Sequence, residues 1–397
     1  MRCWTAWRLR LLGRRRDMFL VPDRFVRVPP ARIGRMARGP FFVHLGRRLP
    51  PVLPGDWDLA GSPNDHDGLY DDLRAVAAGA VWESTEVYRR SVGHIRAGVP
   101  GFDGVTNMEE LASFCARYED LLASMREGGY LSQTRLASLR PQSYKPLDPR
   151  EVTVAVGREG SLLVRQGRHR VACATVLEVP EIPARVAFRH PDWMAVRQRV
   201  ADYAAGNGGR VPQPILHPDL DNIPAARACD VEFERLKDVL RLQGGSLVDL
   251  SPRWGYFCHR FEGVGLTCTA VCSRPEDEWF LRTLREAEQR VFDIVAIDAI
   301  DVRRPFDAAL ALDWMEGVPD RAAAAEELLE LVGRVDAATL IVEVPHVVAG
   351  ASDWEPGGPG DGLADALTHA GGFSTRSLVL WTDSRREVYR LARGRGS

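Results

Sequence analysis

Residues 246–257 read SLVDLSPRWGYF, a short apolar run that ends in aspartate and is followed by a turn. A strand that turns into a helix in this way is the first unit of an open α/β sheet, whose loop carries a ligand. In a loop of the form Asp-x-Gly-x-x-x-Gly, Asp249 closes the strand and Gly255 permits close backbone approach. Ser251 stands where the first glycine is expected, and a positive φ there would cost roughly 1 kcal/mol or more. The stretch predicts a ligand-binding loop with one altered position.

The sequence around and after this stretch alternates strand and helix patterns up to the carboxyl terminus. Strands are expected at residues 246–250, 266–272, 292–298, 306–312, 338–344, 374–381 and 387–393. Helices are expected near residues 255–262, 276–290, 321–333 and 361–370. Such alternation indicates a parallel sheet covered by helices on both faces. The last two strands are joined by the turn TDSRR, so they are expected to form an antiparallel hairpin.

Residues 245–397 resemble the class I S-adenosylmethionine-dependent methyltransferases in the order of these elements. The resemblance implies an α/β fold class with a seven-stranded, doubly wound, Rossmann-like sheet. It also implies S-adenosylmethionine as the cofactor, with Asp249 near its amino-acid end, Gly255 permitting close backbone approach and Asp298 on the adenine side. FDAALAL followed by Asp313 corresponds to the fourth motif of the family, at the carboxyl end of a strand where ligands bind in such sheets.

The end of the second strand departs from the family pattern. Where an acidic residue usually holds both ribose hydroxyls, this chain has Cys272. Losing a charge-assisted hydrogen bond to a ligand costs about 1.5–3 kcal/mol, or ~10- to 100-fold in affinity, unless another acid substitutes. Glu276 and Asp277 are close enough in sequence to do so. Cys272, Glu276 and Asp277 therefore join Ser251 as expected cofactor-binding positions.

Methyl transfer requires alignment of the acceptor with the methyl group and, for a hydroxyl acceptor, a base. Glu316 is one acid near the expected ligand edge, and Asp313, Glu343 and His346 are the predicted catalytic residues. In IVEVPH, Glu343 and His346 fall at the end of the fifth strand. The alternative is that Asp313 and Asp298 only cap turns and that His346 is a surface loop histidine.

A second candidate site is QGRHRVACA, residues 166–174, which reads as a turn into a helix. A helix amino terminus offers unpaired N–H groups and the positive end of the helix dipole, and guanidinium groups bind phosphate bidentately. The turn therefore predicts a phosphate- or nucleotide-binding site formed by Gly167, Arg168, His169 and Arg170. The alternative is that Gly167 makes a tight turn and the arginines pair with neighbouring acids.

The hairpin before this turn and the strand after it resemble the ParB and sulfiredoxin-like fold over residues 148–190. In that superfamily the corresponding turn binds nucleotide phosphates, a role that would fall to Gly167, His169 and Arg170. Sulfiredoxins have a catalytic cysteine where this chain has Arg168, which argues against sulfinic-acid reduction. Partitioning ParB proteins continue with a helix-turn-helix domain that this sequence does not show, which argues against chromosome partitioning.

The region before this module has a helical pattern, with apolar residues at spacings of three and four. Thr106 or Asn107 is expected to cap its second helix, which stops at Gly128–Gly129. The predicted organisation is a basic, Pro/Gly-rich arm at 1–64, a helical region at 65–140, an α+β ParB/sulfiredoxin-like domain at 141–200, a linker and helix at 201–240, and the methyltransferase-like domain at 241–397.

Composition limits the choice of partners and compartment. Residues 1–50 hold 13 arginines against Asp17 and Asp23, whereas acids outnumber bases in the rest of the chain. This balance argues against a nucleic-acid surface on the body of the protein. No apolar run approaches the ~20 residues that span a bilayer. Seven scattered cysteines without a Cys-x-x-Cys pair predict a cytoplasmic protein without a metal site.

Two functions remain open at this point. The first is a methyltransferase for a small polar or phosphorylated acceptor, such as a sugar or nucleotide-linked molecule. The alternative is a nucleotide-binding or phosphotransfer protein that works through the GRHR turn, with the methyltransferase domain as a scaffold. GDWD, residues 55–58, places Trp57 between acids, which suits a sugar or partner surface or an anchor on a neighbouring domain.

Overall fold

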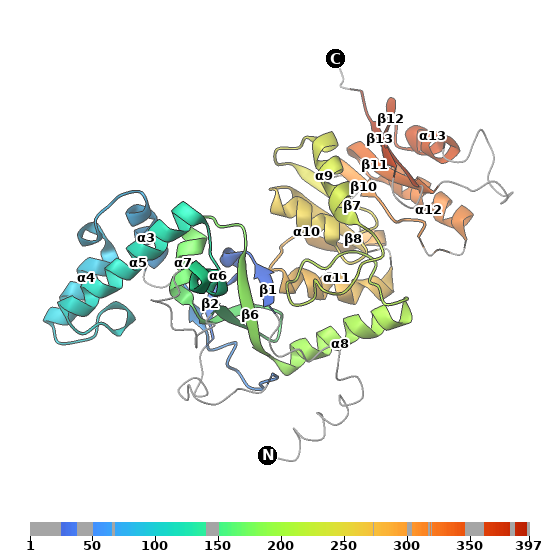
Figure 1. Ribbon diagram of the computed structural model, residues 1–397. Coiled ribbons are helices and arrows are strands. Elements are labelled where there is room, and N and C mark those ends of the chain that lie inside the picture. Colours follow the sequence, from blue (N-terminus) through green and yellow to red (C-terminus); the bar gives the residue numbers. More distant parts are fainter. Residues whose placement is uncertain are drawn as a thin grey trace, which may run out of the picture. The chain divides into compact units, whose positions relative to one another are not determined.

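The computed structural model describes residues 25–37, 51–65, 68–139, 151–272, 274–299, 304–316, 318, 320–345, 361–381 and 386–394. The chain divides into two compact units, Met1–Arg199 and Val200–Ser397 (Figure 1). The helix α8 (Pro191–Gly206) crosses this boundary. In the described part of the chain, no helix combines the length and the apolar character that a membrane span requires.

The carboxyl-terminal unit contains a seven-stranded sheet in the order β12-β13-β11-β10-β7-β8-β9. Neighbouring strands from β11 to β9 are parallel, and β13 is antiparallel to both of its neighbours. The predicted α/β fold with a mostly parallel seven-stranded sheet is thus confirmed. The strands are β7 (Ser246–Asp249), β8 (Thr267–Cys272), β9 (Asp293–Ala296), β10 (Phe306–Ala311), β11 (Ala337–Pro345), β12 (Thr375–Trp381) and β13 (Arg386–Ala392).

Helices cover both faces of this sheet (Figure 1). Alternate residues of β10 point to opposite sides: Ala309 packs into a core cluster with Leu328, whereas Leu310 packs into another with Phe261. Each fully buried leucine or phenylalanine side chain contributes roughly 1.5–3 kcal/mol. Both faces are largely apolar, and the acids Asp249, Asp313 and Glu343 lie where their strands end. The helices are α9 (Cys229–Leu240), α10 (Tyr256–Gly263), α11 (Pro275–Ala287), α12 (Arg321–Arg334) and α13 (Asp361–Ala370).

The amino-terminal unit contains a six-stranded sheet in the order β1-β6-β4-β5-β2-β3. The predicted hairpin, helix and strand appear as β4, β5, α7 and β6, with β6 parallel to β4. Residues assigned from sequence to an arm also belong to this sheet, since β1, β2 and β3 lie between residues 25 and 63. The strands are β1 (Phe25–Val28), β2 (Arg35–Met36), β3 (Ser62–Pro63), β4 (Val152–Val156), β5 (Leu162–Gln166) and β6 (Ile182–Arg189).

The helical region of this unit is broken into separate helices. Asn107 caps α5 by accepting a hydrogen bond from the Glu110 amide at 2.9 Å, and Gly129 ends it with φ 68°. The predicted cap and stop of this helix are therefore confirmed. The helices are α3 (Leu69–Ala77), α4 (Glu86–Arg96), α5 (Met108–Gly128), α6 (Gln133–Leu139) and α7 (Arg168–Val176).

The GDWD motif fastens a loop to the β4–β5 hairpin. Trp57 is buried, donates to the Leu53 carbonyl at 2.8 Å and packs edge-on against Phe188. Asp58 accepts from the Arg158 backbone amide at 2.8 Å and from its guanidinium at 2.9 Å. The tryptophan is thus an anchor within its own unit, and its indole is not exposed to a sugar or a partner.

The Asp58–Arg158 contact predicts an asymmetry between two neighbouring aspartates. The Asp58→Asn substitution should lower the free energy of unfolding by roughly 2–3 kcal/mol, because it removes a buried carboxylate from a charged partner. The Asp56→Asn control, whose side chain is 80% exposed, should cost about 1 kcal/mol or less. Urea unfolding of the full chain measures both, and equal costs would contradict the anchoring role.

Candidate functional site

The sheet of the carboxyl-terminal unit has one point at which its strand order reverses. From β7 the chain moves to β8 and β9 on one side, and then returns to β10 and β11 on the other. In open α/β sheets, ligands bind at the carboxyl ends of the strands beside such a reversal. Asp249 ends β7, Asp313 follows β10 and Glu343 lies near the end of β11. These predicted residues therefore gather at the edge where the topology favours a ligand.

The loop after β7 is held from within. The Leu250 amide donates to the Leu310 carbonyl at 2.8 Å, and the Ser251 hydroxyl donates to the Leu312 carbonyl. Ser251 does not adopt a positive φ; the left-handed residue is Arg253, with φ 53°. Gly255 has φ 91°, and a Cβ there would lie 2.8 Å from Leu281. The altered position of the motif is thus unstrained, and its final residue is favoured as glycine by the left-handed backbone there.

Asp249 is almost fully buried behind this loop. Its Oδ1 accepts the Ser251 amide at 3.1 Å, and its Oδ2 lies 3.9 Å from the Cys258 Sγ. Burial raises the pKa of Asp249 to about 7, and the negative charge of Asp313 acts in the same direction. Asp249 therefore exchanges a proton near neutral pH, and a positive charge brought beside it favours its ionised form.

Arg227 joins the carboxyl ends of two strands. Its guanidinium pairs with Asp313, with Glu343 at 2.5 Å and with Glu232 at 2.6 Å, and all four side chains are at most 10% exposed. A buried charge is tolerated only when it is paired. Sequence reasoning missed Arg227, because the nearest of its two strand-end partners lies 86 residues away in the chain. No local sequence pattern identifies a residue whose partners are so distant in the chain.

The predicted base Asp313 sits in this ion-pair cluster with φ 59°. Burial raises its pKa to about 7, the charge of Arg227 opposes this shift, and Glu343 and Glu316 add to it. A carboxyl group that titrates near neutral pH is suited to accept a proton. His346, the third predicted catalytic residue, lies outside the described residues.

Of the residues near the expected ribose position, Cys272 and Asp277 lie beside a very small cavity, whereas Glu276 faces open space. Cys272 is half-buried, and the buried Asp277 accepts from Trp254 Nε1 at 3.0 Å and pairs with Arg253 at 3.2 Å. The space between Cys272 and Asp277 is a cavity of only about 10 Å³, room for one water at most. Asp277 therefore fixes the local structure, and the carboxylate that reaches open space is Glu276.

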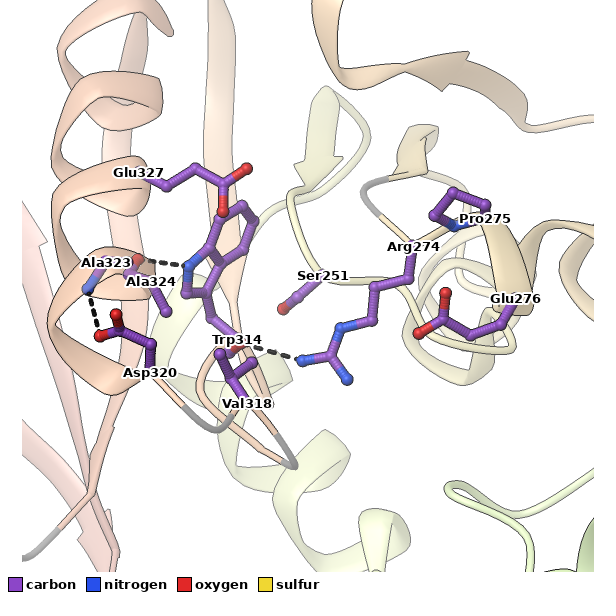
Figure 2. Close-up of a pocket in the computed structure, with 10 residues that line it drawn as sticks. All are labelled: Ser251, Arg274, Pro275, Glu276, Trp314, Val318, Asp320, Ala323, Ala324 and Glu327. Atoms are coloured by element: carbon purple, nitrogen blue, oxygen red, sulfur yellow. Dashed lines mark hydrogen bonds between the residues drawn. The ribbon is translucent and has the colours of Figure 1, made fainter.

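Glu276 faces a larger cavity, of about 600 Å³, which falls within the usual range for small-molecule sites. Figure 2 shows this cavity between the start of α11 and the start of α12. The Trp314 indole is fixed in its wall by a 2.8 Å hydrogen bond to the Ala324 carbonyl. The lining residues are Ser251, Arg274, Pro275, Glu276, Trp314, Val318, Asp320, Ala323, Ala324 and Glu327.

The lining combines one tryptophan, which is only 5% exposed, with several carboxylates. Glu276 and Glu327 make no ion pair among the described residues, whereas Asp320 caps α12 by accepting the Ala323 amide at 3.0 Å. Asp298, predicted on the adenine side, is exposed in a short 3-10 helix (Ile297–Ala299) and does not line this cavity. Arg274 and Glu327 were not singled out from the sequence.

The GRHR turn lies in the amino-terminal unit, where Gly167 takes φ 88° before α7. Arg168 and His169 both contact Asp103, the histidine at 3.0 Å, and Arg170 lies 3.9 Å from Glu151. Burial lowers the pKa of His169 to about 4, with nearby arginines acting in the same direction. The arginines thus pair with acids, and the anion held at the turn belongs to the chain itself.

Comparison with known proteins gives only weak similarities. No family model and no curated protein matches the chain. The bifunctional kinase-methyltransferase WbdD is 18% identical, with a TM-score of 0.36, over 50% of this chain and 47% of that one. Magnesium protoporphyrin IX methyltransferase (ChlM) from Synechocystis PCC 6803 with bound SAH is 12% identical, with a TM-score of 0.32, over 42% and 81%. The chain spans less than half the length of WbdD, and similarities this low do not identify a family.

The described residues include no group of three or more His, Cys, Asp or Glu side chains placed to hold a metal ion.

The raised pKa of Asp249 predicts how stability changes with pH. Because the pKa in the folded state, about 7, lies above the unfolded value of 3.8, the contribution of Asp249 is fully present below about pH 4 and is lost as pH rises through about 7. The Asp249→Asn variant cannot titrate there, so its stability relative to wild type should rise over this window. Urea unfolding at several pH values measures the difference. The control is Asp238→Asn, which changes an exposed carboxylate, and a flat result for Asp249→Asn would contradict the assignment.

Proposed function

We propose that the carboxyl-terminal unit is an S-adenosylmethionine-dependent methyltransferase. The observation that carries this proposal is the cavity at the carboxyl edge of the sheet, beside the Asp249–Gly255 loop and the reversal of strand order. A ligand at this place meets the β7 loop, the start of α11 and the start of α12 together. The β7 loop and the start of α11 hold positions expected from the resemblance to bind the cofactor, whereas the start of α12 was not expected there.

The composition of the cavity suits the adenosine half of that cofactor. Trp314 lies in the cavity wall and only 5% of its surface is exposed, so a purine would contact one edge of the indole and gain less than the about 1–3 kcal/mol of full stacking on an aromatic side chain. Glu276 and Glu327 offer carboxylate oxygens, which accept hydrogen bonds from the two ribose hydroxyls. We assign Glu276 the ribose role that Cys272 cannot fill.

The neighbouring ion-pair cluster suits the cationic end. Arg227 faces Asp313, Glu343 and Glu232, and Asp249 lies near enough to feel the charges of Arg227 and Asp313. Carboxylates thus outnumber guanidinium groups in a buried place, where excess charge of one sign is costly. The amino-acid end of the cofactor carries a sulfonium, an ammonium and a carboxylate group, and its net positive charge would offset part of this excess.

In the transfer step, the acceptor atom attacks the methyl carbon while the sulfonium sulfur leaves with the electron pair of the carbon–sulfur bond. The acceptor's proton passes to a carboxylate, for which Asp313 and Glu343 are the described candidates and His346 the further one. Among the small polar acceptors predicted from sequence, the acidic edge favours a neutral or cationic molecule over a phosphorylated one. The residues otherwise align the two reactants and exclude water.

This proposal predicts saturable binding of S-adenosylmethionine and of its demethylated product S-adenosylhomocysteine, measured by titration calorimetry. The Glu276→Gln variant should weaken both by ~10- to 100-fold, because it removes a charged acceptor for the ribose hydroxyls. Glu278→Gln is the matched control on the same helix, since Glu278 pairs with Arg282 on the surface, and should leave binding unchanged. If no heat of binding is measured at millimolar cofactor, the proposal is wrong.

A second candidate function belongs to the amino-terminal unit. The GRHR turn already holds a carboxylate, Asp103, against Arg168 and His169. We infer that a nucleotide phosphate, the ligand predicted for this turn, binds there by displacing that carboxylate. The predicted phosphate residues would then be Gly167, Arg168, His169 and Arg170.

The displacement has a direct test by thermal shift with ATP, ADP, CTP and GTP. Asp103→Asn should increase the stabilisation by the bound nucleotide, because it removes the competing charge, and Arg170→Ala should reduce it. Asp120→Asn, on the exposed face of α5, is the control and should behave as wild type. A flat response of wild type and Asp103→Asn to all four nucleotides would leave this function without support.

A further inference from the structure

Arg274 connects two loops at the mouth of the 600 Å³ cavity. It follows β8, and its Nη2 donates to the carbonyl oxygens of Asp313 at 3.3 Å, Trp314 at 3.0 Å and Glu316 at 2.9 Å. Figure 2 shows the side chain extending from the start of α11 toward the turn that carries Trp314. One guanidinium nitrogen thus meets three carbonyl groups of a single turn.

The turn that receives these bonds has little regular structure of its own. It follows β10, includes the left-handed Asp313, and contains the backbone hydrogen bond from the Glu316 amide to the Asp313 carbonyl at 3.1 Å. Carbonyl groups in such a turn need a donor when water is excluded from them. Arg274 supplies that donor from the other side of the cavity.

The fixed position of Trp314 depends on both sides of this arrangement. Its indole is bonded to α12 through the Ala324 carbonyl, and its backbone carbonyl is bonded to Arg274. A side chain in the wall of a binding site contributes to recognition when packing and hydrogen bonds set its position in advance. The guanidinium therefore acts on the part of the cavity that the proposed function assigns to adenosine.

We propose that Arg274 is a positioning residue, which holds the Trp314 turn against the β8–α11 loop so that the cavity accepts the adenosine half of the cofactor. This inference rests on the proposed methyltransferase function. Arg274 does not touch the transferred methyl group in this scheme. It sets the geometry of the wall, while Glu276, two residues later, supplies the carboxylate for ribose.

A direct role for Arg274 in binding an anionic ligand fits the cavity less well. Glu276, Asp320 and Glu327 line the same space, so an incoming phosphate would meet three carboxylates and one guanidinium. The bonding nitrogen of Arg274 is also committed to backbone carbonyls. A lysine could not reproduce the planar group that serves them, since its ammonium is a single point of charge on a flexible stem.

The ligand experiment compares S-adenosylhomocysteine with 5′-methylthioadenosine, which lacks the amino-acid end, by titration calorimetry on the full chain. Arg274→Met should weaken both ligands by the same factor, about tenfold, because it acts on the adenosine wall; Arg274→Lys should fall between this variant and wild type. Arg282→Met, a surface arginine of α11 paired with Glu278, is the control and should bind as wild type. A double variant with Trp314→Phe should lose less than the product of the two single losses, because both changes act through one wall.

Hydrogen–deuterium exchange gives a readout that needs no ligand. Backbone amides of residues 313–316 should exchange faster in Arg274→Met than in Arg282→Met, while the amides of β7 keep their wild-type rates. If wild type binds neither adenosine ligand, the proposed function falls even if the exchange result holds. If wild type binds both ligands and Arg274→Met binds them equally well, the positioning role is overturned and the methyltransferase proposal stands. Unchanged exchange in the turn would also overturn the positioning role.

Discussion

The buried guanidinium of Arg227 is the interaction on which the ligand edge of the carboxyl-terminal unit depends. Asp313 and Glu343 stand at the ends of two neighbouring parallel strands, and side by side they would repel each other in a place that water hardly reaches. Arg227 brings a positive charge between them from the segment before α9, and Glu232 holds the guanidinium from the helix side. The ends of β10 and β11 and the start of α9 are therefore fixed relative to one another by one side chain.

This constraint follows from the way the sheet is built. Apolar residues fill most of both faces, and the acids of the candidate site lie where the strands end. Because the strand order reverses between β7 and β10, Asp249 and Asp313 lie at the same edge although 64 residues separate their numbers. Burial then raises the pKa of both carboxyl groups toward neutrality. The burial that stabilises the core thus also makes the charges of Asp249 and Asp313 sensitive to pH and to nearby ions.

Much of the fold could be predicted from sequence, because alternating strand and helix patterns are local and the hairpin, helix and strand around GRHR are too. The site was predicted less completely, because its contacts are not local. Arg227 and Asp313 are 86 residues apart, and His169 meets Asp103 across 66 residues. The choice between Glu276 and Asp277 was also beyond the sequence: adjacent helical residues point about 100° apart, and which of them faces Trp254 is decided by packing.

The absence of an acid at the end of β8 does not by itself argue against binding of a ribose. A strand-end carboxylate is only one way to place an oxygen beside a ribose; the first turn of the following helix is another, and it lies four residues later at Glu276. An acid there is also favoured by the positive end of the α11 dipole. In the proposed arrangement the carboxylate is on the helix, so the strand does not set its position. The contacts of the surrounding loops must then hold it in place. Arg274, between Cys272 and Glu276, donates hydrogen bonds to the turn that carries Trp314. We therefore propose that Arg274 and Glu276 act together, the first fixing the loop and the second binding the ribose.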